Sequence, residues 1–564
     1  MEMFSLFGRR GAVAVCIMLS ACAAGPGGTA AQTAQPDPAY GAFLAARYAD
    51  SQNDPASAAK FYAKALQTAP NNQELIAEGF LAGLLSGNPL AATLAPRLPG
   101  NALATLLLGN QTAANGNFDQ ASQLFTTLPR DDLAGLIKPL LLAWAKFGQG
   151  NEQAALNGLG PYFNNGPFGP VYVLNAALIA DAAGDTKNAA QLYSAVDTSK
   201  PNLRLAQILA SWKARQGQEA QAQATLAALI TAHPDLRIAL PALQAQVKDP
   251  VISTAAQGMA EAYLTLAGSL SQPQATFLRT VFLRFALQLR PDLSAARLLL
   301  ASSQTGADVP NFTPTPVEMQ NALDTLAPIA KTDPLYGPAA LEQANLLAAL
   351  DQTKPAVALL QGLLAATPDD AGLLATTGDV LRSASQYNDA MSYYTQAITA
   401  AGNPPPANAW SLFYDRAICE DQTGNWQAAE PDLQEALQLS PNQPYVLNYL
   451  GYSWALRGEH LGEAKAMLTR AAGLTPNDGA VIDSLGFVEM KQGNTKGALS
   501  LLIQAVQLSP DDPEVNGHLG DAFWQAGQKL QADFQWQRAL SLQPSPKLAA
   551  ELQGKIEQHF GTAD

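Results

Sequence analysis

The sequence predicts an all-α fold, a solenoid in which antiparallel helix pairs stack one after another. Three observations predict it: a proline period near the C-terminus, a ladder of small and large apolar residues with the same period, and the lack of sustained β-type alternation in the sequence. The prolines fall 35, 34 and 34 residues apart, at Pro441, Pro476, Pro510 and Pro544. A helical unit of nearly constant length therefore repeats in register over this part of the chain.

The unit that ends at Pro510 shows the ladder clearly. Its marked positions are Leu485, Gly486, Gly493, Ala498, Leu502, Ala505 and Pro510. Gly486 is small because the two helices of a pair approach closely where they cross. Gly493 ends the first helix in a left-handed conformation, and Pro510 ends the second because it cannot donate the next backbone hydrogen bond. Asp512 and Pro513 then start the next helix as its N-cap and first-turn residue.

This ladder resembles the tetratricopeptide (TPR) repeat, a helix-turn-helix unit of 34 residues. The resemblance implies a right-handed TPR superhelical solenoid of antiparallel helix pairs. Roughly a dozen to fourteen units, several of them degenerate, are expected to cover nearly all of the mature chain. The amphipathic stretch Pro546–Phe560 is expected to form the C-terminal capping helix that such stacks require.

Departures from the period divide the chain. Ser303–Pro316 holds three prolines and no apolar rhythm, and Gly402–Pro406 is a shorter break before the best repeats. The predicted segments are a lipoprotein signal peptide (1–21), a flexible tether (22–38), a degenerate TPR solenoid (39–302), a loop or hinge (303–316), a continued TPR solenoid (317–404), a well-formed TPR block (405–544) and a capping helix (545–564).

The N-terminus predicts export. Arg9 and Arg10 precede an apolar run that ends in the tetrapeptide Leu19-Ser20-Ala21-Cys22. That tetrapeptide resembles the lipobox of bacterial lipoproteins, whose cysteine is diacylated, so we expect lipidation at Cys22. An ordinary signal peptide cut near Ala23 or Ala24 is the alternative. Because Ala23 is not the aspartate of an inner-membrane retention signal, the expected location is the periplasmic face of the outer membrane.

The tether and the body have distinct compositions. Residues 23–38 are rich in Ala, Gly, Pro, Gln and Thr, which predicts a flexible segment with a typical reach of about 20 Å. The chain carries a net charge of −14 and 14% charged residues, a balance unsuited to nucleic acid. Once Cys16 leaves with the signal and Cys22 is acylated, Cys419 stands alone and is expected to be a small buried hydrophobe.

No motif for chemistry was found. The four histidines lie in separate units without metal-ligand spacing: His233, His460, His518 and His559. HExxH, CxxC, GxSxG and phosphate-binding glycine loops are all absent from the sequence. The sequence therefore predicts a protein that is not an enzyme and that uses no cofactor and no metal.

A binding surface is implied by the TPR resemblance, because the first helix of each TPR unit lines a concave groove. The inward positions of that register are Tyr414, Asp421, Tyr445, Asn448, Tyr452, Asp483, Phe487, Lys491, Glu514, Asp521 and Trp524. We expect Tyr452, Phe487 and Trp524 to form one strip that holds an extended or helical protein segment. The alternative is that these rings only fill gaps between adjacent repeats.

The C-terminal block resembles a proteobacterial family of TPR outer-membrane lipoproteins over Trp410–Leu542. Its successive signatures are Leu447–Trp454, Asp483–Phe487 and His518–Trp524. Members of that family usually carry Trp and Tyr where this chain has Phe487 and Met490. One branch implies an adaptor that scaffolds a carboxyl-terminal processing protease and presents peptidoglycan hydrolases to it. An assembly factor for a pilus secretin, a polysaccharide exporter or an outer-membrane protein complex is the second possibility, and a cell-wall spacer the third.

Overall fold

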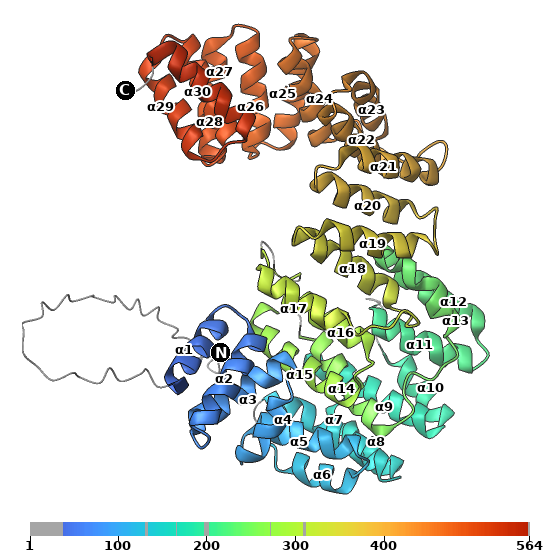
Figure 1. The fold of residues 1–564 in the computed structure, drawn as a ribbon. Helices are drawn as coiled ribbons and strands as arrows, with labels where there is room; N and C mark the ends of the chain where they lie inside the picture. The colour runs from blue at the N-terminus through green and yellow to red at the C-terminus, as the bar shows by residue number, and fades with distance from the viewer. Residues whose placement is uncertain are drawn as a thin grey trace, which may run out of the picture. The chain divides into compact units, whose positions relative to one another are not determined.

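The computed structural model describes residues 38–129, 133–164, 166–196, 202–270, 272–307, 309 and 312–561. The regular secondary structure of these residues is entirely helical, without strands, so the all-α prediction is confirmed (Figure 1). The predicted signal peptide, Cys22 and all but the last residue of the predicted tether lie outside the described residues.

The first of two compact units ends at Leu98. Its helices are α1 (Pro38–Ser51), α2 (Pro55–Thr68), α3 (Gln73–Ser86), α4 (Leu90–Leu94) and the 3-10 helix η1 (Ala95–Arg97). In the pair α1–α2 the small residue Ala46 and the ring of Tyr62 are both fully buried, and the Tyr62 hydroxyl donates to Asp50 at 2.6 Å. The ladder seen near the C-terminus therefore begins with the first described helix pair.

The second compact unit begins at Pro99, a division that the sequence did not predict. Its helices pair in succession: α5 (Ala102–Ala114) with α6 (Phe118–Thr126), α7 (Leu133–Gly148) with α8 (Glu152–Leu159), α9 (Gly169–Ala183) with α10 (Thr186–Ser194), α11 (Leu203–Arg215) with α12 (Glu219–Ala232), α14 (Ala255–Gly268) with α15 (Thr276–Leu289), α16 (Ser294–Gln304) with α17 (Pro316–Leu326), α18 (Tyr336–Ala349) with α19 (Thr353–Leu364), α20 (Ala371–Ser383) with α21 (Tyr387–Ala401), α22 (Trp410–Gln422) with α23 (Trp426–Leu439), α24 (Pro444–Arg457) with α25 (Leu461–Leu474), α26 (Gly479–Lys491) with α27 (Thr495–Leu508), and α28 (Pro513–Gln525) with α29 (Lys529–Ser541).

Shorter elements join these pairs. They are η2 (Gly160–Tyr162), η3 (Gly166–Phe168), η4 (Pro234–Ala239), α13 (Leu240–Ala245), η5 (Pro273–Ala275) and η6 (Ala407–Ala409). The last helix, α30 (Pro546–Phe560), packs on α29 and has the bounds expected of the capping helix. The predicted loop at 303–316 overlaps the last two residues of α16 and the first residue of α17.

Helix crossings are as tight as the ladder predicts. A Cβ added at Gly486 would lie 2.7 Å from Cγ of Leu502, and one at Gly520 would lie 2.4 Å from Cδ1 of Trp536. Gly493 adopts a φ of 81°, the left-handed conformation expected at the end of a first helix. The Asp512 side chain accepts hydrogen bonds from two backbone amides at the start of α28, which confirms its role as an N-cap.

The helix α14 departs from a simple stack. Ten of its 14 residues are buried, and it packs on α5, α7 and α9, helices far away in the sequence. The Tyr263 hydroxyl donates to Asn110 of α5 at 3.2 Å, and a Cβ at Gly258 would lie 2.3 Å from the Trp144 ring of α7. On α11, Arg204 donates to both carboxylate oxygens of Glu261, at 2.6 to 3.0 Å.

These contacts place α14 over groove positions. Asn110 directly follows the crossing residue Gly109, just as Phe487 follows Gly486 and Asp521 follows Gly520 in the C-terminal block. The chain's own helix therefore covers, in the N-terminal half of this unit, positions that correspond to the predicted groove. A helix with apolar residues on nearly all sides is typically buried. This pattern in α14 is the feature of the sequence from which its burial could have been predicted.

Candidate protein-binding groove

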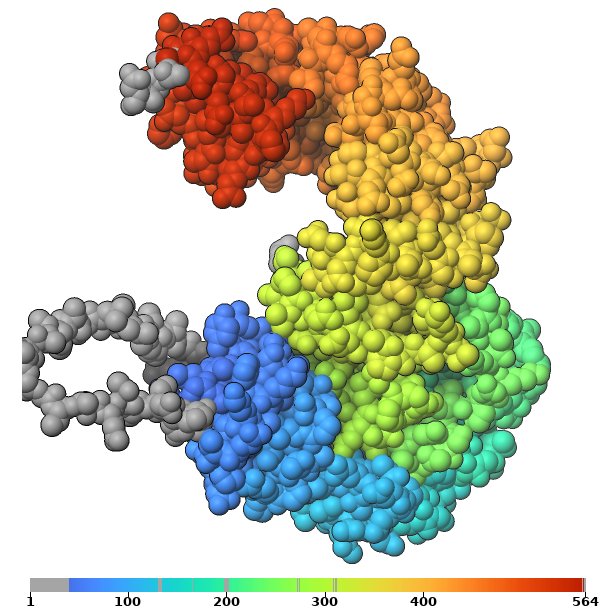
Figure 2. Space-filling model, in the orientation of Figure 1, coloured from blue at the N-terminus to red at the C-terminus, as the bar shows by residue number. Residues whose placement is uncertain are grey.

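The C-terminal block, coloured orange to red in Figures 1 and 2, contains a cavity of about 510 Å³. Its walls come from α24, α26 and α28, the first helices of three successive pairs, and from α29 and α30. Six of the predicted groove residues line it: Tyr452, Phe487, Lys491, Glu514, Asp521 and Trp524. The structure thus brings together side chains that span 73 positions of sequence, from Tyr452 to Trp524.

One wall of the cavity is aromatic and hydrogen-bonded across repeats. The Tyr452 hydroxyl donates to Glu514 at 2.7 Å, and the Tyr452 and Phe487 rings lie 5.3 Å apart between centroids. The Lys491 ammonium lies 5.0 Å from the Phe487 ring centroid, within the range of a cation–π contact. Phe487 is only 5% exposed, so it supports this wall more than it presents a surface.

Beneath this wall lies a buried ion pair. Nδ1 of His518 is 2.7 Å from Oδ2 of Asp483, and the imidazole packs on the Phe487 ring at 4.6 Å. Burial alone would lower the pKa of His518, but attraction to Asp483, with Glu514 and Asp521 adding to it, raises that pKa to about 9. Burial raises the pKa of Asp483 despite its positive neighbour. Asp483 therefore orients His518 and is itself buried.

The capping helix forms the opposite wall. Lys555 of α30 lies 2.9 Å from Asp521 and 2.7 Å from Glu551. The Trp524 indole stacks on His559, and Leu552 is fully buried behind them. Asp521 and Trp524 are thus in contact with the chain's own C-terminal helix.

The remaining predicted residues lie on α22 and α24, outside the lining of this cavity. Asp421 accepts from the Tyr449 hydroxyl at 3.0 Å and pairs with Arg457 at 2.5 Å. Tyr414 meets Tyr449 edge to face, with centroids 5.9 Å apart. The other two residues, Tyr445 and Asn448, are exposed and half-buried respectively. That these positions hold a partner stays a prediction.

The sequence analysis did not predict several residues that line the cavity or bond to the predicted groove residues. His518 and Arg457 complete the polar contacts just described, and α30 supplies six more lining residues, among them Glu551, Lys555 and His559. These three follow one another at intervals of four, which places them on one face of a helix. That polar spacing was the signal that α30 turns a functional face toward the groove.

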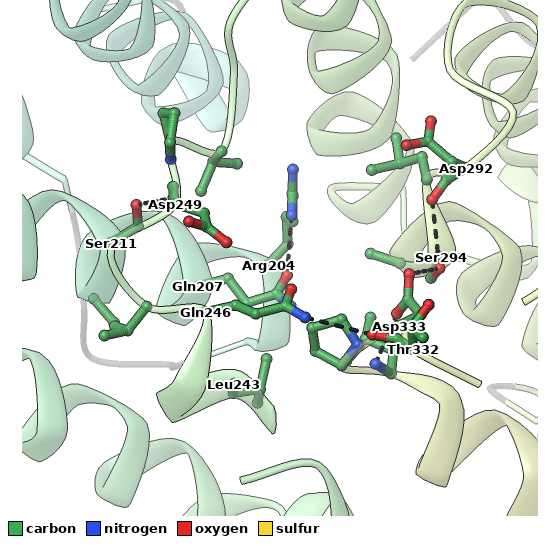
Figure 3. Close-up of a pocket in the computed structure, with 18 of the residues that line it drawn as sticks. Arg204, Gln207, Ser211, Leu243, Gln246, Asp249, Asp292, Ser294, Thr332 and Asp333 are labelled. Carbon is green, nitrogen blue, oxygen red and sulfur yellow. Dashed lines mark hydrogen bonds between the residues drawn. The ribbon is translucent and has the colours of Figure 1, made fainter. Parts of the chain in front are cut away.

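A second cavity of about 440 Å³ lies between α11, residues 246–251, the start of α16 and residues 330–335 (Figure 3). Its polar groups largely bond to one another. Arg204 donates to Gln207, Ser211 to the Asp249 carbonyl, and Ser294 to the Asp333 carboxylate. These internal pairings describe a packing junction in which few groups are left for a ligand.

Three further kinds of feature were considered among the described residues: a reactive cysteine, a metal site and a membrane-spanning helix. Cys419 is fully buried, as expected, and burial raises the pKa of its thiol to about 11. Within the part of the chain that the structure describes, no cluster of three metal-ligating side chains occurs. None of the described helices combines the length and apolar character needed to cross a bilayer.

Comparison with protein families identifies the repeats. Residues 414–479 and 485–556 match a tetratricopeptide repeat model. These segments contain α23 to α25, α27 to α29, part of α26 and most of the cavity lining. The protein is therefore an all-α helical-repeat protein that contains TPR repeats in its C-terminal part. TPR repeats generally bind peptides or proteins.

Two curated proteins are similar over part of their length. The TPR repeat-containing protein PA4667 of Pseudomonas aeruginosa is 30% identical over 200 residues, which cover 36% of this chain and 33% of that protein. The human aspartyl/asparaginyl beta-hydroxylase is 29% identical over 128 residues, covering 22% of this chain and 17% of that protein. The matched stretches thus span a third or less of either relative.

Several solved structures match the chain at low TM-scores. Yeast Tom70 covers 81% of this chain with a TM-score of 0.37 at 13% identity. A chain of the APC/C hetero-tetramer Cut9–Hcn1 covers 92% of this chain with a TM-score of 0.37 at 15% identity. YrrB, described as a TPR protein with an unusual peptide-binding site, covers 31% with a TM-score of 0.26 at 22% identity.

Proposed function

We propose that this protein is a lipid-anchored periplasmic scaffold whose C-terminal TPR block binds segments of other proteins. The observation that carries the proposal is the single cavity lined by inward residues of α24, α26 and α28. A surface contributed by three successive first helices suits a ligand that is extended along the stack rather than a compact small molecule.

The chemistry of the groove fits a polypeptide. Lys491 and Glu514 line the cavity and are exposed, and Tyr445 of α24, outside the cavity lining, is 54% exposed. An aromatic ring offers contact area at low entropic cost, while charges of both signs fix the register and orientation of a bound segment. Because Phe487 and Asp483 are buried, we assign them to supporting the groove and assign the contacts to the three exposed residues.

The anchor rests on the sequence. Leu19-Ser20-Ala21-Cys22 at the end of an apolar run favours lipidation at Cys22, and Ala23 favours the outer membrane over inner-membrane retention. We propose attachment to the membrane through these acyl chains, with the repeats in the periplasm.

Within this class we propose an adaptor that links a periplasmic carboxyl-terminal processing protease to peptidoglycan hydrolases. Its support is the resemblance of residues 410–542 to TPR outer-membrane lipoproteins. A scaffold with this role needs no catalytic residues of its own, in keeping with the lack of catalytic motifs in the sequence.

Affinity capture from solubilised envelopes tests the proposal. The wild-type chain is compared with Glu514→Lys and Lys491→Glu, two exposed residues that line the cavity, and with Phe534→Ser as a matched control. Phe534 is 68% exposed on α29 and does not line the cavity.

Recovery of a protease and hydrolases that falls with the groove variants but not with the control supports the adaptor. Groove-dependent recovery of a secretin or an exporter favours the assembly factor instead. Partners that are unaffected by both groove variants contradict binding at this site.

A further inference from the structure

The first described helix has an uncovered apolar face. Tyr40, Leu44 and Tyr48 of α1 are 61%, 49% and 69% exposed. Their spacing of four residues places them on one side of the helix, over a length of about 12 Å. The opposite side, represented by Ala42 and Ala46, is buried in its own unit. We call Tyr40, Leu44 and Tyr48 the α1 stripe.

Later helix pairs show what usually covers such a face. Tyr48 lies two residues after the small crossing residue Ala46. The equivalent residues of six later first helices are all buried at 6% exposure or less: Leu346, Val380, Cys419, Ser453, Val488 and Ala522. In those pairs the preceding second helix packs against the first helix. The six residues carry no ring, because a neighbouring helix leaves room for small or aliphatic side chains.

Tyr48 therefore differs from its counterparts in size and exposure. A phenol ring at this position holds a further helix away, which disfavours a second copy of the chain that stacks on α1 as another repeat would. Tyrosine instead suits a boundary between an apolar layer and water, because its ring is apolar and its hydroxyl is polar.

The exposed charged side chains of α1 and α2 have one sign. They are the basic residues Arg47, Lys60 and Lys64, and Arg47 also lies 3.6 Å from Glu78 of α3. The acidic residues of this pair are only half-exposed and accept hydrogen bonds, Asp50 from Tyr62 and Asp54 from the Ser57 amide. A basic patch on a chain with a net charge of −14 matches anionic phospholipid headgroups.

The position of α1 in the chain brings this face near a membrane. Its first residue, Pro38, comes 16 residues after Cys22, the anchor of the proposed function. The tether predicted between them has a typical reach of about 20 Å. The first described surface after the anchor is thus apolar and aromatic, and it belongs to a helix pair with three exposed basic side chains.

We propose that the α1 stripe lies on the phospholipid surface, with the Tyr40, Leu44 and Tyr48 side chains at headgroup level and the three cations against anionic lipids. This inference rests on the proposed lipid anchor. An acyl anchor gains a second, weaker membrane contact in this way, and the first helix pair is held in a fixed orientation to the bilayer.

A polarity-sensitive fluorophore at Leu44→Cys tests the contact in the full lipidated chain, reconstituted in vesicles that contain anionic phospholipid. Gln67→Cys, exposed on α2, is the matched control. Cys419 is buried and Cys22 is acylated, so each variant offers one reactive thiol. We expect a blue shift and quenching by spin-labelled lipid at position 44 and neither change at position 67. A label at Tyr48→Cys should repeat the result.

The outcomes separate the two proposals. If the protein floats with the vesicles but the labels at positions 44 and 48 remain exposed to water, the α1 contact is overturned and the anchor is supported. Protein that does not float overturns the anchor and, with it, this inference. Shielding of position 44 that depends on protein concentration without vesicles identifies a second copy as the occupant and also overturns the inference.

Discussion

The indole of Trp524 stacks on the imidazole of His559, with ring centroids 3.9 Å apart and planes inclined by 26°. The two rings come from α28 and α30, so the contact joins the capping helix to the floor of the groove. Trp536 adds a third ring, 5.8 Å from Trp524. Trp524 therefore has a structural role besides any contact with a partner, and Tyr445, Lys491 and Glu514 are the better probes of binding.

Replacing Trp524 with alanine is expected to loosen the C-terminal end of the stack. Loss of the stacking and of the apolar area should cost about 2–3 kcal/mol, less than for a fully buried ring because Trp524 is half-buried. Hydrogen exchange should show the loss in α30 and α28. Tyr445→Ala, the exposed control, should change stability by about 0.5 kcal/mol or less. Equal exchange rates in α30 for the Trp524 variant and the wild type contradict this structural role.

The close approach of helices at the crossings should leave no room for an added side-chain atom. A pair of glycine substitutions tests this expectation. Gly486→Ala forces its new Cβ toward Leu502, at 2.7 Å, and should destabilise the fold by about 1–3 kcal/mol. Gly473→Ala, in α25, meets nothing within 4 Å and should stabilise by about 0.5–1 kcal/mol through helix propensity. Urea unfolding followed by circular dichroism compares the two. Effects of the same sign would show that the crossing at Gly486 is misassigned.

The His518–Asp483 pair predicts a pH dependence of stability. The pKa of His518 rises from its ordinary value of 6.5 to about 9 in the folded protein. The pair thus stabilises fully below pH 6.5, and its contribution is lost as the pH rises from 6.5 to 9, by about 3 kcal/mol at most. Melting temperatures measured over that range should fall in the wild type. Asp483→Asn removes the attraction and should flatten the curve; an unchanged slope in this variant would exclude the pair as its cause.

Lipidation at Cys22 is tested by Cys22→Ser. The hydroxyl cannot form the thioether that carries the acyl chains, so the body should move from the membrane fraction to the soluble periplasm. Two or more acyl chains hold a protein firmly, whereas the face of α1 alone supplies only a weak contact. If the Cys22→Ser variant still sediments with membranes after a high-salt wash, the anchor lies elsewhere.

The sequence predicts the repeat architecture well because its signals are local. Gly486, Gly493 and Asp512 each report a constraint within one helix pair: a crossing, a left-handed turn and an N-cap. The structure has each of them in that role. The capping helix likewise has the predicted bounds, Pro546–Phe560.

Contacts between distant pairs were not predictable in the same way. Glu261 meets Arg204 because α14 lies across α11, and no period in the sequence encodes that return of the chain. Tyr452, Phe487 and Trp524, which the register assigns to one strip, line the same cavity, and their contact with a partner stays a prediction. The register did not show that Phe487 is buried or that α30 reaches Trp524, because exposure depends on which neighbours pack on an inward position.

Site-specific photo-crosslinking in intact cells tests the central claim most directly, that the C-terminal groove holds other proteins. A photoreactive amino acid replaces Leu456 of α24, which lines the cavity, or Phe534 on α29, which does not; both residues are exposed. We expect crosslinks to one defined set of envelope proteins from position 456, lost when Lys491→Glu is added, and no such set from position 534. Crosslinks to the same proteins from 534 but not from 456 would contradict this claim.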